Sequence, residues 1–328
     1  MFEQVFKTID RSVRPCSRTR RAARNMNLPD VRVSIPPSRW TMLAFSTIGL
    51  GPLTQAAPAP TPPPAIVRQV DHLLLSSPEA GELFSLLTDI FQLPVAWPLS
   101  DYGRFGSGGV ALGNVNLEIL RAAGPDHNAS SHRFVGLALE PAPLPTSLRE
   151  LERRNLPHGP AIPFRSRELS RLFATLWTTV ALPDVSHDLL EVFLCDYAHD
   201  VTARRQRLQA QLRASDGGPL TIHSVREIVI GAKDVNGMKA RWQKLLEPRR
   251  PSSDGAWPLG DGPALRVVEA ETDAIRAVVI NVSSLKAAGD FLRQHDLLGT
   301  ELPTSMTVAS RRFPGFELTL VASTPAAP

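Results

Sequence analysis

Cysteine is scarce in this sequence, with Cys16 and Cys195 the only two in 328 residues. So small a number excludes a disulfide framework as the source of stability. Cys195 lies within an apolar run, residues 192–195, that is typical of a strand, so we expect it to be a small buried hydrophobic side chain. The chain must therefore be held together by an ordinary core, for which its 43% of hydrophobic residues suffices.

No apolar run in the sequence is long enough to cross a membrane as a helix. One apolar stretch begins at Trp40 and ends near Leu53, after an arginine-rich segment and before small residues and a Pro/Ala tract. This order is typical of a secretory signal, so we expect residues 1–64 to be a leader and the protein to be exported, periplasmic or secreted. A disordered tail, a transit peptide and a translation start at Met26 are the alternatives, and without a signal peptide the chain is cytoplasmic or organellar.

Residues 65–328, which follow the leader, carry no large excess of positive or negative charge. The leader holds nine Lys/Arg against three Asp/Glu, which leaves 27 against 29 in the remaining residues. A slightly acidic body is not typical of nucleic-acid binding. A Gly-rich phosphate loop before a helix and a nucleophile elbow are also absent from the sequence, so nothing supports a dehydrogenase or a serine hydrolase.

The sequence does contain a repeat. The tetrapeptide Ala-Trp-Pro-Leu occurs at residues 96–99 and again at 256–259, each time after an apolar strand and an amphipathic helix. The same order of strand, helix and further strands returns four times from residue 67 onward, which indicates a duplicated supersecondary unit. One unit alone would leave its sheet half exposed, whereas two units together close a curved sheet around a cavity.

The pattern predicts two domains and the ends of several helices. We expect one domain of two units over residues 65–197, a connecting helix or linker over 198–218, and a second domain of two shorter units over 219–328. The first helix is predicted near 78–91. Capping side chains are predicted at Thr146 or Ser147 with Glu150 in the first turn, at Asp234, and at Ser283 or Ser284.

These units, with the opening strand Val70-Asp71-His72 and the segment Leu-Gly-Asn-Val-Asn-Leu-Glu at 112–118, resemble the vicinal oxygen chelate superfamily. That superfamily includes glyoxalase I, extradiol dioxygenases and bleomycin-resistance proteins. The resemblance covers residues 66–322 and implies an α+β fold, with four βαβββ modules forming two glyoxalase-like half-barrel domains. The chain is similar to uncharacterised glyoxalase-like proteins, for which no reaction is implied.

The resemblance also implies a metal site, because enzymes of the superfamily hold a divalent ion with side chains from the first and last strands of paired units. Transferred to this sequence, the ligands are His72 and Glu118 in the first unit and Glu191 in the second, with Asp196 as the alternative to Glu191. Val135, at the remaining position, cannot be a ligand. Such nitrogen and oxygen donors suit Zn²⁺, Ni²⁺, Mn²⁺ or Fe²⁺.

The second half departs from this pattern. Glu227, Arg266 and Ala277 stand where ligands are expected, and only Glu317 keeps its place. Extradiol dioxygenases carry two histidines and a glutamate in this half, so the resemblance argues against that reaction. Glu227 and Arg266 are expected to pair with each other, and the second half is expected to be a scaffold or a binding lobe.

Each candidate site residue also has a structural alternative. A histidine on an apolar strand is by default a satisfied core residue, and a single carboxylate on a strand can face solvent. Trp97, Tyr102 and Arg104 are expected to line a substrate pocket. The alternatives are wall packing for Trp97 and solvated loop positions for the other two.

The sequence therefore predicts a divalent-metal-dependent lyase or isomerase acting on a small oxygenated molecule in the N-terminal barrel, with Glu118 and Glu191 as catalytic carboxylates. The alternative is a non-catalytic protein that sequesters a small molecule, as bleomycin-resistance proteins do, because Val135 and Ala277 leave the ligand set incomplete. The expected partners are a small-molecule ligand and a second copy of the chain in a homodimer, with no nucleic acid and no membrane span.

Overall fold

Strand β1 (Val67–Ser76) is buried along almost its whole length, which fits an apolar strand at the centre of a sheet. The computed structural model describes residues 62–102, 105–122, 132–165, 174–187 and 189–323. The predicted leader thus lies outside the described residues, apart from its last three. Within the described ranges, no helix is long and apolar enough to span a bilayer.

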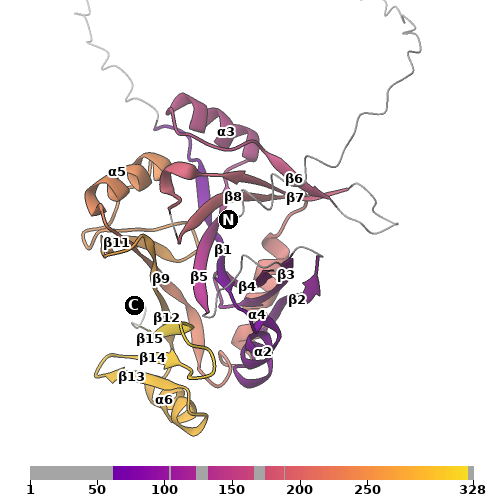
Figure 1. Ribbon diagram of the computed structural model, residues 1–328, viewed down its shortest axis with the longest axis vertical. Coiled ribbons are helices and arrows are strands. Elements are labelled where there is room, and N and C mark those ends of the chain that lie inside the picture. Colours follow the sequence, from indigo (N-terminus) through magenta and orange to yellow (C-terminus); the bar gives the residue numbers. More distant parts are fainter. Residues whose placement is uncertain (1–61, 103–104, 123–131, 166–173, 188, 324–328) are drawn as a thin grey trace, which may run out of the picture. The chain divides into compact units, whose positions relative to one another are not determined.

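The first and second units share one eight-stranded sheet in the order β2-β3-β4-β1-β5-β8-β7-β6 (Figure 1). In the first unit β1 lies parallel to β4, and in the second β5 lies parallel to β8; β1 and β5 join the units as an antiparallel pair. The bounds are β2 (Val95–Asp101), β3 (Phe105–Ala111), β4 (Asn116–Ala122), β5 (Arg133–Pro141), β6 (Ile162–Arg165), β7 (Thr175–Ala181) and β8 (Glu191–Tyr197).

The third and fourth units form a seven-stranded sheet in the order β10-β11-β9-β12-β15-β14-β13, and β9 and β12 are its central antiparallel pair. The α+β fold class with two repeated-unit sheets is therefore confirmed. The bounds are β9 (Ile222–Ala232), β10 (Ala256–Trp257), β11 (Ala264–Glu269), β12 (Ala274–Val282), β13 (Leu298–Leu302), β14 (Ser305–Ala309) and β15 (Glu317–Ala322).

Each unit carries its helix between its first and second strands. The first-unit helix is α2 (Ala80–Ser85) followed by a π-helical turn, η2 (Leu86–Ile90). The others are α3 (Leu144–Arg153), α5 (Val235–Leu246) and α6 (Leu285–Gln294). A further helix, α4 (Thr202–Ala214), connects the two sheets where the connecting helix was predicted, and a short helical turn, η4 (Pro183–Val185), precedes β8.

Two of the three predicted helix caps are confirmed. Asp234 accepts a hydrogen bond from Gly237 N at the start of α5, and Ser284 does the same for Ala287 N at the start of α6. The cap predicted at Thr146 or Ser147 is wrong, because α3 begins at Leu144 and Pro145 fits its first turn, where the proline needs no backbone N–H. The Ser147 hydroxyl instead donates to the carbonyls of Ile66 and Ala142.

The side chain of Asn114 links the first sheet to the second. Its amide donates to the carbonyl of Val225 on β9 at 3.0 Å, and its carbonyl accepts from the N–H of Val225 at 2.9 Å. The neighbouring Gly113 has φ +92°, and a Cβ there would lie 2.5 Å from the carbonyl of His223, so this turn requires glycine.

Replacing Asn114 by alanine is expected to destabilise the protein by about 1–3 kcal/mol, because both backbone groups of Val225 would lose their partner. Urea unfolding followed by far-UV circular dichroism measures this loss. Asn236→Ala on the exposed face of α5 is the matched control and is expected to stay within about 0.5 kcal/mol of the wild type. Equal losses in the two variants would contradict the linking role of Asn114.

Candidate functional site

His72 and Glu118, the two ligands predicted in the first unit, lie side by side on the eight-stranded sheet. In the parallel ladder of β1 and β4, Glu118 is level with Leu74, two residues beyond His72, so both side chains share one face. His72 Nε2 lies 3.0 Å from Glu118 Oε2. The imidazole is 6% exposed and the carboxylate 14%, so the pair is largely screened from water.

The second ring nitrogen of His72 lies 2.7 Å from Asp71 Oδ2. A regular strand would turn the adjacent Asp71 to the opposite face. The ladder between β1 and β5 has a register shift between Val70 and His72, and an irregularity of this kind re-aims side chains. The sequence analysis quoted Asp71 only as part of a motif and missed its contact with the imidazole, since strand alternation gives no signal for it.

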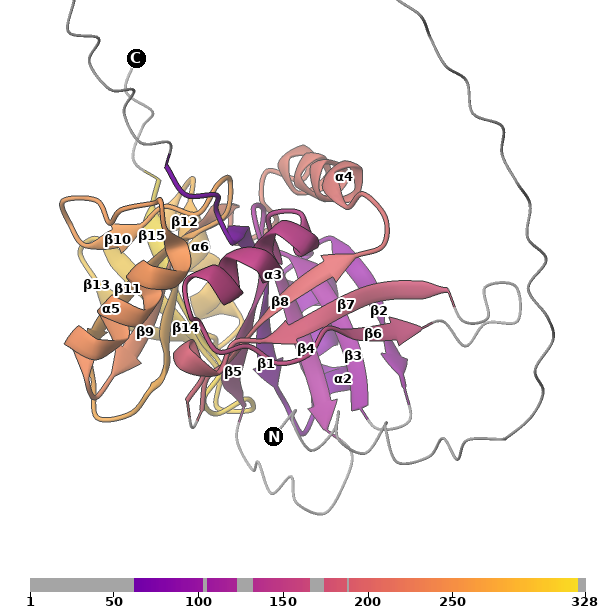
Figure 2. The same ribbon diagram turned by 90° about the horizontal axis from the view of Figure 1, so that it is seen from above.

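Asp71 is itself held by a cluster of polar side chains. The Tyr197 hydroxyl donates to Asp71 Oδ2 at 3.1 Å, and Arg205 Nη2 contacts Asp71 Oδ1 at 3.1 Å and Glu140 Oε2 at 2.8 Å. Gln69 Nε2 donates to the same Glu140 oxygen at 2.8 Å. Arg205 belongs to α4, which Figure 2 shows beside the first sheet, so the connecting helix completes the site.

These contacts decide the charge of His72. Burial alone would lower its pKa, but the hydrogen bonds and charges of Asp71 and Glu118 outweigh burial and raise the pKa to about 9. Burial pushes the pKa of Asp71 upward, yet the bonds and charges of His72 and Arg205 leave it below its ordinary value. Without a metal, the site therefore holds an imidazolium between two carboxylates at neutral pH.

Glu118 is fixed from its other side by β3 and β2. The Ser107 hydroxyl donates to Glu118 Oε1 at 2.5 Å and accepts from Trp97 Nε1 at 3.0 Å. The Trp97 ring meets the His72 ring edge-on, with centroids 6.0 Å apart. A Cβ on Gly109 would lie 2.6 Å from the Trp97 ring, so this close packing requires glycine on β3.

The other two predicted pocket residues have different outcomes. Tyr102 is partly buried and stacks on Phe105 with centroids 5.1 Å apart. Burial, and then the charge of Glu118, raises the pKa of Tyr102, which places this phenol within electrostatic range of the site. Arg104 lies outside the described residues.

The second unit places fewer polar side chains on the face of His72. On β5, Ala138 pairs with His72 of β1 on one side and with Phe193 of β8 on the other. Gly136 pairs in the same way with Leu74 and Glu191. Phe193 and Glu191 therefore lie on the same face of the sheet as His72. Phe193 presents its ring to His72 at a centroid distance of 6.1 Å. Glu191 is partly buried on this face, and its role as a ligand or catalytic carboxylate stays a prediction.

The donors can be tested for their fit to a divalent metal. The 3.0 Å between His72 Nε2 and Glu118 Oε2 is about the spacing of adjacent ligands whose bonds to an ion are roughly 2.1 Å. A carboxylate on the other imidazole nitrogen, here Asp71, is the usual support of a metal-bound histidine. The described residues contain no group of three or more His, Cys, Asp or Glu that could hold a metal. The pair therefore fits two adjacent ligand positions, and water or ligand oxygens would supply the others.

The position in the second sheet that corresponds to His72 and Glu118 holds an ion pair in place of two potential metal ligands. Glu227 on β9 is level with Ala264, and Arg266 stands two residues further along β11, the same offset that separates His72 and Glu118. Arg266 Nε donates to Glu227 Oε1, so the predicted pairing of these two residues is confirmed. Glu317 is exposed at the start of β15.

Comparisons with known proteins find solved structures of similar fold but no similar sequence. No family model matches the chain, and no curated protein matches it in sequence. Among solved structures, a hypothetical protein from Staphylococcus aureus is 11% identical with a TM-score of 0.52 and covers 77% of this chain and 98% of its own. A variant of homoprotocatechuate 2,3-dioxygenase from Brevibacterium fuscum is 10% identical with a TM-score of 0.53, over 83% of this chain and 77% of its own. The same enzyme in complex with 3,4-dihydroxyphenylacetate is 11% identical with a TM-score of 0.51, over 83% and 86%. These similarities confirm the fold that the repeated units predicted.

Proposed function

Because the chain has the fold of the vicinal oxygen chelate superfamily, we propose that it is a glyoxalase-like enzyme whose His72 and Glu118 hold a divalent metal ion. It acts on a small oxygenated molecule at the first sheet as a lyase or isomerase. The observation that carries this proposal is the 3.0 Å approach of His72 Nε2 to Glu118 Oε2 on a largely buried face. A bound ion would polarise vicinal oxygens of the substrate and stabilise the enolate-like charge formed when a proton leaves the adjacent carbon.

The neighbouring side chains orient His72 and Glu118 for metal binding. Asp71 accepts from Nδ1 of His72, which fixes the tautomer and turns Nε2 toward Glu118. Ser107 holds Glu118 Oε1 and leaves Oε2 facing the imidazole. Glu191, on the same face, is the proposed second carboxylate that transfers the substrate proton.

Charge balance favours an anionic ligand at this site. Protonated His72, Arg205 and Arg68 together balance Asp71, Glu118 and Glu140 when no metal is present. A divalent ion that replaces the Nε2 proton adds one positive charge in a site with little access to water. An enediolate or another anionic oxygen would restore neutrality, which fits a substrate that becomes an enolate during the reaction.

The proposal is tested by metal analysis of the purified full chain. After incubation with Zn²⁺, Ni²⁺, Mn²⁺ or anaerobic Fe²⁺ and desalting, we expect about one ion per chain for one of these metals, because the donor set contains one imidazole–carboxylate pair. His72→Ala and the size-conserving Glu118→Gln are expected to lose the ion. His223→Ala, at an exposed histidine of β9, is the matched control and should retain it. A wild type that retains none of the four metals, or a folded His72→Ala that still holds the ion, overturns the metal site.

A second candidate function is metal-free binding of a planar small molecule. It is favoured by Phe193, which presents an aromatic ring to His72 from the second unit, two residues from Glu191 on the same face of β8. Phe164 and Trp177 add a second aromatic surface, stacked with centroids 4.1 Å apart and planes 9° apart. Stoichiometric binding of a planar molecule by protein treated with EDTA, with no metal-dependent turnover, would favour this candidate. Export and a homodimer are kept as proposals for either function.

A further inference from the structure

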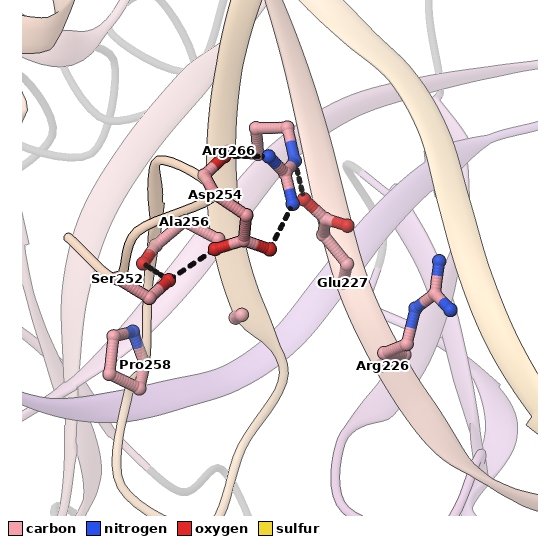
Figure 3. Close-up of a pocket in the computed structure, with 8 residues that line it drawn as sticks. Arg226, Glu227, Ser252, Asp254, Ala256, Pro258 and Arg266 are labelled. Atoms are coloured by element: carbon pink, nitrogen blue, oxygen red, sulfur yellow. Dashed lines mark hydrogen bonds and ion pairs between the residues drawn. The ribbon is translucent and has the colours of Figure 1, made fainter. Parts of the chain in front are cut away.

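The second sheet contains a cavity of about 360 Å³ that no step of the proposed reaction uses (Figure 3). Its charged lining consists of Arg226, Glu227, Asp254 and Arg266, and Ser252 and Pro258 belong to its wall. The Glu227–Arg266 pair occupies the register position that His72 and Glu118 occupy in the first sheet. The cavity therefore lies at the position of the second sheet that corresponds to the His72–Glu118 pair of the first, but its side chains are not a metal-binding set.

Arg266 holds two carboxylates that line this cavity. Its Nε donates to Glu227 Oε1, and its Nη2 lies 2.8 Å from Asp254 Oδ2. Its Nη1 donates to the backbone carbonyl of Asp254, and the Ser252 hydroxyl donates to Asp254 Oδ1 at 2.5 Å. All three guanidinium nitrogens thus donate to protein oxygens, so Arg266 orients the two carboxylates.

Glu227 keeps one oxygen available. Its side chain is 8% exposed, and Oε1 is bound to Arg266. No donor for Oε2 is recorded among the described residues, and Figure 3 shows this oxygen turned away from Arg266. Oε2 is not among the sealed side-chain atoms of the described residues, so solvent or a ligand in the cavity can reach it. Since Glu227 and Asp254 carry two negative charges beside the one positive charge of Arg266, a cationic group is favoured at Oε2.

Arg226 adds a positive charge to the lining of the cavity. Its side chain is exposed, lines the cavity, and has no carboxylate partner in the part of the chain that the structure describes. A guanidinium of this kind recognises a carboxylate. We propose that the cavity binds a small amino carboxylate, with its ammonium group on Glu227 Oε2 and its carboxylate on Arg226.

Isothermal titration calorimetry of the full chain tests this proposal with ω-amino carboxylates of increasing length: glycine, β-alanine, 4-aminobutyrate and 5-aminopentanoate. We expect one-to-one binding of at least one of them. The singly charged n-butylamine and butyrate are expected to bind at least tenfold more weakly, because each lacks one of the two charge-assisted contacts.

Two variants assign the contacts. Glu227→Gln is expected to weaken binding at least tenfold, and Arg226→Gln, at an exposed side chain that keeps the fold, several-fold. Arg276→Gln on the exposed side of β12 is the matched control and should bind as the wild type does. The proposal is overturned if no amino carboxylate binds the wild type at millimolar concentration, if butyrate binds as tightly as the zwitterions, or if Arg226→Gln leaves binding unchanged. The result is independent of the metal test, because neither Glu227 nor Arg226 contacts His72 or Glu118.

Discussion

Replacing Arg205 by methionine is expected to lower the free energy of unfolding by about 3–5 kcal/mol, which is typical when one partner of a buried charge cluster is removed. The Arg205 side chain is 16% exposed and lies between Asp71, 2% exposed, and Glu140, 11% exposed. Methionine retains the apolar stem of arginine but leaves two buried carboxylates without their shared cation. Urea unfolding at pH 7 measures the loss.

Arg207→Met is the matched control for this prediction. Arg207 lies on the same helix, α4, and is exposed. Its replacement should stay within about 0.5 kcal/mol of the wild type. A loss of similar size in both variants would mean that the helix, and not the charge cluster, determines the effect. A stable Arg205→Met protein would show that Asp71 and Glu140 do not depend on this guanidinium.

The fold could be predicted from the sequence because its signals are local and repeated. Apolar alternation, helical stripes and capping residues such as Asp234 each act over a few residues, and their fourfold order gave the pairing of units that the two sheets show. Strand β6 has a weak signal of its own, because it is only four residues long and contains Pro163, which argues against a strand.

Only part of the candidate site could be predicted in this way. His72 and Glu118 come together through the ladder of β1 and β4, as the resemblance to the vicinal oxygen chelate superfamily implied. The contact of Asp71 depends on a local irregularity in strand register, and that of Arg205 on how α4 packs against the first sheet. Such contacts arise from tertiary structure between segments far apart in the sequence, and no periodicity in the chain encodes them.

The second large effect is a pH dependence of stability. Because the pKa of His72 is raised in the folded protein, the free energy of unfolding is expected to fall as the pH rises. An unfolded histidine titrates near 6.5, whereas His72 in the folded protein titrates at about 9. The folded state thus holds the proton more tightly, and its contribution is fully present below pH 6.5 and is lost as the pH rises to 9. At about 1.4 kcal/mol for each pKa unit, the contribution amounts to about 3 kcal/mol.

Comparison of the wild type with His72→Gln isolates this contribution. With EDTA present, so that no ion replaces the proton, the wild type should lose about 3 kcal/mol relative to His72→Gln between pH 6.5 and 9, in urea unfolding at half-unit steps. His223→Gln, at an exposed histidine, should follow the wild type across the whole range. Wild-type and His72→Gln curves that stay parallel would mean that His72 is neutral beside Asp71 and Glu118. In that case the free Nε2 would be available to a metal without competition from a proton, and ion binding should show no proton release between pH 6.5 and 9.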